Sequence, residues 1–166
     1  MSSTNRRQSV TGRWSGQYCY DPTEKMAVPG AVGFTLILKQ GWFGRFSGTV
    51  TDGAGGMPGV GTIRGRLKSP RIEFVKQMPV SYVGTPEGVA ITLRESVAKL
   101  GIESKADVPH APIYYSGEFV DTSHAQGQWI IRAARVPLGD GRVLNMPEGR
   151  GTWRLEAMAS ANVREN

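Results

Sequence analysis

Short runs in which large apolar and polar residues alternate dominate the chain, and this is the pattern of β-strands with one buried face. In the first run, Trp14, Tyr18 and Tyr20 share a face with Gly16. The pattern recurs along the chain between turn-forming residues. It predicts eight strands, at about residues 13–20, 34–39, 45–51, 61–67, 71–78, 113–119, 127–132 and 150–157.

One segment changes to a helical period between the fifth and sixth strands. Thr85 suits an N-cap, Pro86 suits the first helical position, and Gly101 can end a helix. We therefore expect a helical insertion over about residues 85–101, with the helix itself over about 86–100. Its apolar stripe consists of Val89, Leu93, Val97 and Leu100.

Glycines recur on the inward faces of the strands, between larger residues. Glycine weakens a strand unless space is needed, and a small closed barrel needs small residues beside large ones. The predicted fold class is therefore all-β, an eight-stranded antiparallel meander barrel with one inserted helix. We expect a flexible N-terminal tail over 1–11, one barrel domain over 12–158 and a frayed C-terminal tail over 159–166. The inward glycines are Gly16, Gly48, Gly65 and Gly117.

The composition fits this architecture and bounds the compartment. The 166 residues are enough for one domain with its own core, and the 22 glycines and 10 prolines suit many tight turns. Cys19 is the single cysteine, so an intrachain disulfide is excluded. No stretch approaches the ~18 apolar residues of a membrane helix, and the N-terminus lacks the apolar run of a signal peptide. We expect a cytoplasmic protein with no membrane partner.

The net charge of +6 raises the question of nucleic-acid binding. The basic residues are dispersed over nearly every predicted strand and interleaved with acidic ones, whereas phosphate-binding surfaces gather them on one face. We therefore interpret the charge as a solvated surface and do not expect a nucleic-acid partner.

Several predicted strands resemble those of the calycin-like barrels, and the avidin pattern most closely. The segment Gly12-Arg13-Trp14-Ser15-Gly16-Gln17 is similar to the first strand of that group, with the G-x-W start that lipocalins share. Three later strands are similar to the third, sixth and seventh. They are Gly44-Arg45-Phe46-Ser47-Gly48-Thr49, Tyr115-Ser116-Gly117-Glu118-Phe119 and Gln128-Trp129-Ile130-Ile131.

The resemblance implies a ligand inside the barrel. Trp129 and Tyr115 match two aromatic positions of the avidin site, and Asp52 falls near a polar one. Gly16 and Val50 stand where avidins carry hydrogen-bonding side chains for biotin. The ligand implied is therefore one other than biotin.

A charged residue stands among the inward-facing positions of the fifth strand. Lys76 shares the face of the core, where a charge must be paired or lie at a wet barrel mouth. Its alternative role is structural, with the ammonium reaching solvent from the strand end. We predict a binding site for a small apolar or amphipathic ligand, including an anionic one such as a carboxylate. The candidate ligand-binding residues are Tyr18, Tyr20, Asp52, Phe74, Lys76, Tyr115 and Trp129.

Two other function classes stay open. The first is a protein–protein interaction module with a fully packed core, whose partner contacts the outer arginines of neighbouring strands. The second and less favoured is a haem or isomerase-type barrel enzyme. His110 and His124 fall in predicted loops, so no catalytic residue, metal site or cofactor is predicted. A homo-oligomer remains open. The outer arginines are Arg13, Arg132, Arg150 and Arg154.

Overall fold

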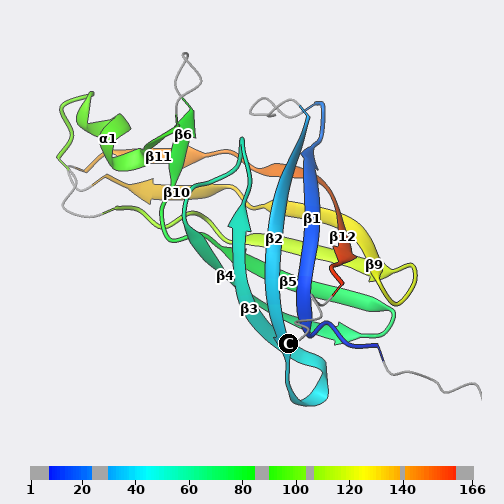
Figure 1. The fold of residues 1–166 in the computed structure, drawn as a ribbon. Coiled ribbons are helices and arrows are strands. Elements are labelled where there is room, and N and C mark those ends of the chain that lie inside the picture. Colours follow the sequence, from blue (N-terminus) through cyan, green and yellow to red (C-terminus); the bar gives the residue numbers. More distant parts are fainter. Residues whose placement is uncertain (1–7, 24–29, 85–89, 104–106, 139–140, 160–166) are drawn as a thin grey trace, which may run out of the picture.

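The structure is a computed structural model of the 166-residue chain. It describes residues 8–23, 30–84, 90–103, 107–138 and 141–159. Two parts are visible in Figure 1, namely a barrel of long strands and a group of short elements inserted near one end of it.

Eight antiparallel strands close into a barrel in the order β1-β12-β9-β8-β5-β4-β3-β2. Barrel strands that follow one another in the sequence are paired side by side, so the sheet is a meander, as the alternation predicted. A 3₁₀ turn, η1 (Trp42–Gly44), joins the second and third strands. The strands are β1 (Gly12–Tyr20), β2 (Ala31–Gln40), β3 (Arg45–Asp52), β4 (Val60–Lys68), β5 (Arg71–Gln77), β8 (Ile113–Phe119), β9 (His124–Ile131) and β12 (Gly149–Ala157).

The first and last strands pair along most of their length, from Trp14 opposite Ala157 to Tyr20 opposite Gly151. This pairing confirms closure, which the sequence predicted from its inward glycines. A closed sheet has no edge strand whose backbone groups are left unpaired.

The glycines create the room that the aromatic side chains occupy. A Cβ atom on Gly16 would lie 2.3 Å from the Phe34 ring, and one on Gly65 would lie 2.4 Å from the Phe46 ring. The barrel interior is thus packed by rings that approach the backbone of neighbouring strands. Its most deeply buried members include Val10, Leu36, Val50, Ile63, Ile72, Phe74, Met78, Trp129 and Trp153.

The insertion between the fifth and sixth barrel strands contains two short strands and a short helix. These are β6 (Tyr82–Gly84), β7 (Ala90–Thr92) and α1 (Leu93–Ala98). The prediction of a helix beginning at residue 86 was wrong over 90–92, which are a strand, and residues 85–89 lie outside the described part. The helix begins later because Thr92 and Glu95 form a reciprocal capping box.

Part of the predicted helical stripe is a small second core. Leu93 and Val97 are buried with Ile102, whereas Leu100 is 70% exposed because the helix has ended before it. A hairpin of β10 (Ala134–Pro137) and β11 (Val143–Met146) follows β9. The alternation of apolar and polar residues did not predict this hairpin, whose residues Leu138 and Leu144 pack on the second core.

The N-terminal tail predicted over 1–11 is ordered at its end, where Val10 is fully buried in the core. The backbone amide of Val10 donates to Gln40 Oε1 at 2.9 Å, and its carbonyl accepts from Trp14 Nε1 at 2.8 Å. Residues 1–7 and 160–166 lie outside the described part. Among the described residues, no helix combines the length and the apolar character needed to cross a bilayer.

We expect Gly65→Ala to destabilise the barrel by about 1–3 kcal/mol, the typical cost of an added carbon in a packed core. Its Cβ would meet the Glu73 carbonyl oxygen at 2.5 Å and Phe74 Cβ at 2.6 Å, besides the Phe46 ring. The matched control is Gly33→Ala in β2, whose Cβ would have no neighbour closer than 3.9 Å. Urea unfolding of the two variants measures the difference, and equal midpoints would contradict this account of the glycines.

Candidate functional site

Among the described residues, the charged side chains of the barrel interior lie at the end where β3 and β5 finish. Lys76 on β5 and Asp52 on β3 form an ion pair between Nζ and Oδ1. Both side chains are shielded from solvent, with exposed fractions of 2% and 0%. We call this end of the barrel the mouth, and the opposite end, where Trp14 packs on Phe119, the packed end.

The carboxylate of Asp52 accepts from two donors, one on each oxygen. Lys76 Nζ donates to Oδ1, and the backbone amide of Met57 donates to Oδ2 at 3.1 Å. The 52–59 segment that follows β3 folds back over its own first residue to supply the Met57 amide. Both oxygens of Asp52 therefore have a protein partner, and the side chain has no exposed surface.

The ammonium of Lys76 is less completely paired. Asp52 is its single acceptor among the described residues, although an ammonium has three N–H donors. Nζ lies 5.2 Å from the centroid of the Tyr18 ring and 5.9 Å from that of Phe34, within the range of cation–π attraction. Burial lowers the pKa of Lys76, and the charge and hydrogen bond of Asp52 oppose that shift.

The structure brings the seven predicted binding residues together around this ion pair. The rings of Tyr20 and Trp129 meet edge to face at 4.9 Å, and Tyr18 lies 6.1 Å from each of them. The rings of Phe74 and Tyr115 are stacked with their centroids 4.6 Å apart, in the layer of side chains next to these three rings. They gather because their positions share the inward parity, so side chains from opposite parts of the closed sheet meet in one interior.

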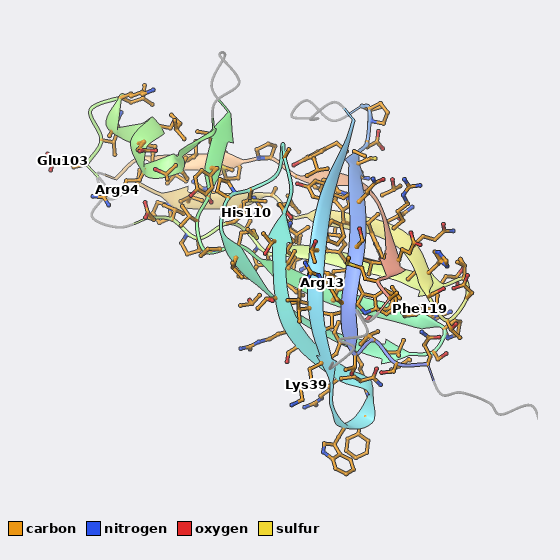
Figure 2. All side chains as sticks on the ribbon, in the orientation of Figure 1. Arg13, Lys39, Arg94, Glu103, His110 and Phe119 are labelled. Atoms are coloured by element: carbon orange, nitrogen blue, oxygen red, sulfur yellow. The ribbon has the colours of Figure 1, made fainter. Side chains whose placement is uncertain are left out.

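Three residues at the mouth were missed as site residues. Met57, Ile131 and His110 are half-buried there, as is the predicted Tyr20. His110 was interpreted as an exposed loop residue, but its segment is anchored where the Gln77 side chain donates to its carbonyl oxygen. In Figure 2, His110 lies towards the end with the inserted elements, and Lys39 lies at the opposite end.

His110 adds a titratable group close enough to feel the ion pair. Burial lowers the pKa of its imidazole, while a hydrogen bond to the Ala111 carbonyl oxygen at 2.6 Å opposes that shift. The charge of Lys76 lowers the pKa further and that of Asp52 raises it. No sequence pattern links residue 110 to residues 52 and 76, since only the course of the segment before β8 places it there.

Three tyrosines share the same enclosed environment. Burial is the main cause that raises the pKa of Tyr18, Tyr20 and Tyr115 above the ordinary value of 10.0, and the negative charge of Asp52 adds to each shift. The three hydroxyls are therefore neutral donors or acceptors over the physiological pH range. The mouth offers an ammonium, a carboxylate and neutral hydroxyls within an aromatic lining.

Two surface hollows lie away from the mouth. Two shallow hollows, of about 950 and 690 Å³, lie on the outer wall of the barrel and are lined mainly by outward-facing side chains. The arginines considered for a protein partner lie on or next to adjacent strands, as predicted, but three contact the protein itself. Arg154 donates to Gln17, Arg150 pairs with Glu148, and Arg132 lies 4.7 Å from the Tyr114 ring centroid.

No family model, curated protein or solved structure matches the chain. The structure shows a closed eight-stranded antiparallel meander barrel, which is consistent with the calycin-like resemblance, and membership of the calycins or avidins stays a prediction. Within the described residues, no three His, Cys, Asp or Glu side chains gather in a way that could hold a metal ion.

We expect Asp52→Asn to destabilise the barrel by about 3–5 kcal/mol, because it leaves the buried ammonium of Lys76 without a counter-ion. The amide of the variant keeps an oxygen that can accept from the Met57 amide, so the measured loss of stability reports the removed charge. Lys76→Met is expected to cost a similar amount. The double variant should recover part of the sum, and additive losses in urea unfolding would argue against a coupled pair.

Raising the pH should remove stability once the unfolded chain begins to ionise its tyrosines. Because the folded pKa values of Tyr18 and Tyr115 are raised, each contributes stability that is present below pH 10 and is lost above it. The loss is up to about 1.4 kcal/mol per pH unit for each buried tyrosine. Lys76 acts oppositely below its ordinary pKa of 10.5, because there its lowered pKa makes stability rise with pH.

The measurement is urea unfolding between neutral and strongly alkaline pH, followed together with tyrosinate absorbance. In Tyr115→Phe the free energy of unfolding should fall less steeply as the pH rises above 10, since the unfolded variant has one hydroxyl fewer to ionise. Ionisation of all five tyrosines while the barrel is still folded would be incompatible with their enclosure.

Proposed function

We propose that the protein binds a small amphipathic carboxylate at the mouth of the barrel, with the carboxylate on Lys76 and the apolar part against the half-buried rim. The observation that carries the proposal is the buried ammonium of Lys76, which has one protein acceptor among the described residues. An ammonium donor without an acceptor is costly in an apolar interior, and a ligand oxygen would satisfy it.

The partners of Asp52 favour an anionic ligand over a cationic one. The Asp52 carboxylate has no exposed surface, and each of its oxygens already accepts a hydrogen bond, one from Lys76 and one from the Met57 amide. Lys76 uses only one of its three N–H donors among the described residues, so the larger open hydrogen-bonding capacity of the pair lies on the cation. A carboxylate would form a charge-assisted hydrogen bond there, which is among the stronger kinds in proteins.

Packing limits where the ligand lies and how large it is. Towards the packed end, the interior is filled by buried rings and aliphatic chains, with Trp14, Phe46 and Leu38 all at most 4% exposed. At the mouth, Tyr20, Met57 and Ile131 are only partly buried and offer apolar surface. A short ligand resting on this rim, with its head group at Lys76, fits this division, and eight-stranded barrels commonly hold one small ligand.

The test measures displacement of the anionic dye anilinonaphthalene sulfonate by octanoate and, separately, by octanol. We expect octanoate to displace the dye at one site per chain and octanol to bind about tenfold more weakly, the effect of one charge-assisted hydrogen bond. In Lys76→Met the advantage of octanoate over octanol should disappear while octanol binding is retained, since the methionine keeps the apolar stem.

Two variants serve as comparisons. Lys39→Met removes an exposed lysine near the other end of the barrel and should leave the preference for octanoate unchanged. Tyr20→Ser should weaken both ligands, because it removes apolar surface at the rim without touching the ion pair. No saturable displacement, or an octanoate preference that survives Lys76→Met, would overturn the proposal.

A further inference from the structure

The turn between β2 and β3 holds two large aromatic side chains in solvent at the packed end of the barrel. Trp42 is 85% exposed and Phe43 is 83% exposed, the highest values among the large hydrophobic residues that the structure describes. Neither ring contacts another ring or a cation within the described part of the chain. We call this pair the aromatic tip.

The backbone fixes the aromatic tip in its outward position. Phe43 has a φ of 56° and a ψ of 30°, a left-handed conformation that is uncommon for a bulky residue. Gly44 follows with a φ of 73°, and a Cβ there would lie 2.1 Å from the Leu67 carbonyl oxygen. The turn is therefore seated tightly on β4, and strain of this kind tends to persist at functional positions.

Exposed basic side chains surround the base of this turn. Arg45 lies directly opposite Arg66 across β3 and β4, and Lys68 lies opposite Arg71 across the β4–β5 turn. Like charges placed opposite each other destabilise a sheet, so these two pairs oppose folding. We call five exposed cations the basic collar: Lys39, Arg45, Arg66, Lys68 and Arg71.

Nearby acidic residues do not cancel the basic collar. Glu73 lies opposite Arg66 and Glu118 lies opposite Arg71 in the strand register. Neither forms an ion pair with a collar residue among the described residues. Five cations and two facing acids leave a net positive charge around the base of the aromatic tip, and Figure 2 shows Lys39 beside the protruding turn.

We propose that the aromatic tip and the basic collar form a peripheral membrane-binding site for a bilayer that contains anionic phospholipid. Tryptophan favours the headgroup region, an adjacent phenylalanine can enter the acyl boundary, and lysine and arginine are attracted by anionic headgroups. A protruding turn suits a deformable bilayer because it needs no matching pocket. In this arrangement the strained turn holds the two rings outward for insertion, and the like-charge pairs provide the positive surface that attracts the headgroups.

This contact differs from the kind of membrane partner that the sequence analysis considered. The expectation of no membrane partner followed from the lack of a long apolar stretch, which a spanning helix requires. Peripheral attachment requires only a few apolar side chains and a basic surface. The site also lies at the opposite end from Lys76, so the proposal is independent of the proposed ligand.

The test uses flotation of the full chain with phosphatidylcholine vesicles, with and without phosphatidylglycerol. Binding should require phosphatidylglycerol and should fall as salt is raised. Trp42 supplies a second readout, because the other three tryptophans, Trp14, Trp129 and Trp153, are each 3% exposed. Tryptophan emission should shift to shorter wavelength on binding, and Trp42→Phe should bind without that shift.

Variants separate the role of the turn from an effect on folding. Trp42→Ser combined with Phe43→Ser should weaken partitioning at least about tenfold, since two large apolar side chains no longer enter the bilayer. Arg45→Glu should also weaken it, although it replaces a like-charge pair with an opposite-charge pair and should not destabilise the barrel. The controls are Leu100→Ser, at another exposed apolar residue, and Arg135→Glu, the same charge change on β10.

Three results would overturn the proposal. One is the absence of binding to phosphatidylglycerol vesicles, and another is binding that the tip and collar variants leave unchanged. The third is self-association in solution that the Trp42→Ser/Phe43→Ser variant abolishes, because the tip would then serve a second copy of the chain instead of a lipid surface.

Discussion

The pairing of β1 with β12 closes the sheet and thereby fixes the volume into which every inward side chain must fit. Eight strands enclose only enough space for side chains or for one small ligand. Each large ring must therefore be matched by a small residue across from it. The approach of Phe34 to Gly16 and of Phe46 to Gly65 is a direct result of this constraint.

The same constraint gives the Lys76–Asp52 pair its importance. In an open sheet both side chains could reach water, and their attraction would contribute little to stability. Inside the barrel, each charge is costly unless the other is present. An apolar pair of similar size would have stabilised the fold as well or better. Stability alone therefore does not account for two charges and three neutral hydroxyls at one end, and the ligand site that we propose gives them a role.

Local patterns predicted the barrel because each of its strands has one buried face, so that alternation marks its boundaries within a few residues. They failed where short segments pack on a second core. Thr85-Pro86-Glu87 has the composition of a helix start, yet the capping box is built from Thr92 and Glu95. The β10–β11 hairpin was missed because its strands have four residues each and none of these residues is fully buried, although Asp140-Gly141 in the sequence is a common hairpin turn pair.

For the candidate site too, the sequence predicted which side chains face the interior but not which of them contact one another. Parity placed Lys76 inside the barrel, and the resemblance to the avidin pattern pointed to Asp52. Their partnership depends on the register of three strands, in which Val50 faces Gly61 and Ile63 faces Lys76. His110 and the Met57 amide could not be inferred, because loops without a period carry them to the mouth. Strand patterns thus define which face a residue occupies, and tertiary contacts decide which residues meet there.

The two ends of the barrel differ in where their polar and apolar groups lie, and this difference follows from how each end is covered. At the mouth, the segment after β3 and the segment before β8 bring Met57 and His110 over the interior, so charges can be buried there. At the packed end, rings fill the interior and the turns are short, so aromatic and basic residues of those turns face solvent. Buried charges suit a small ligand, whereas exposed rings among cations suit a broad anionic surface. One fold can therefore carry two separate sites, because the packed interior between its ends keeps their chemistry apart.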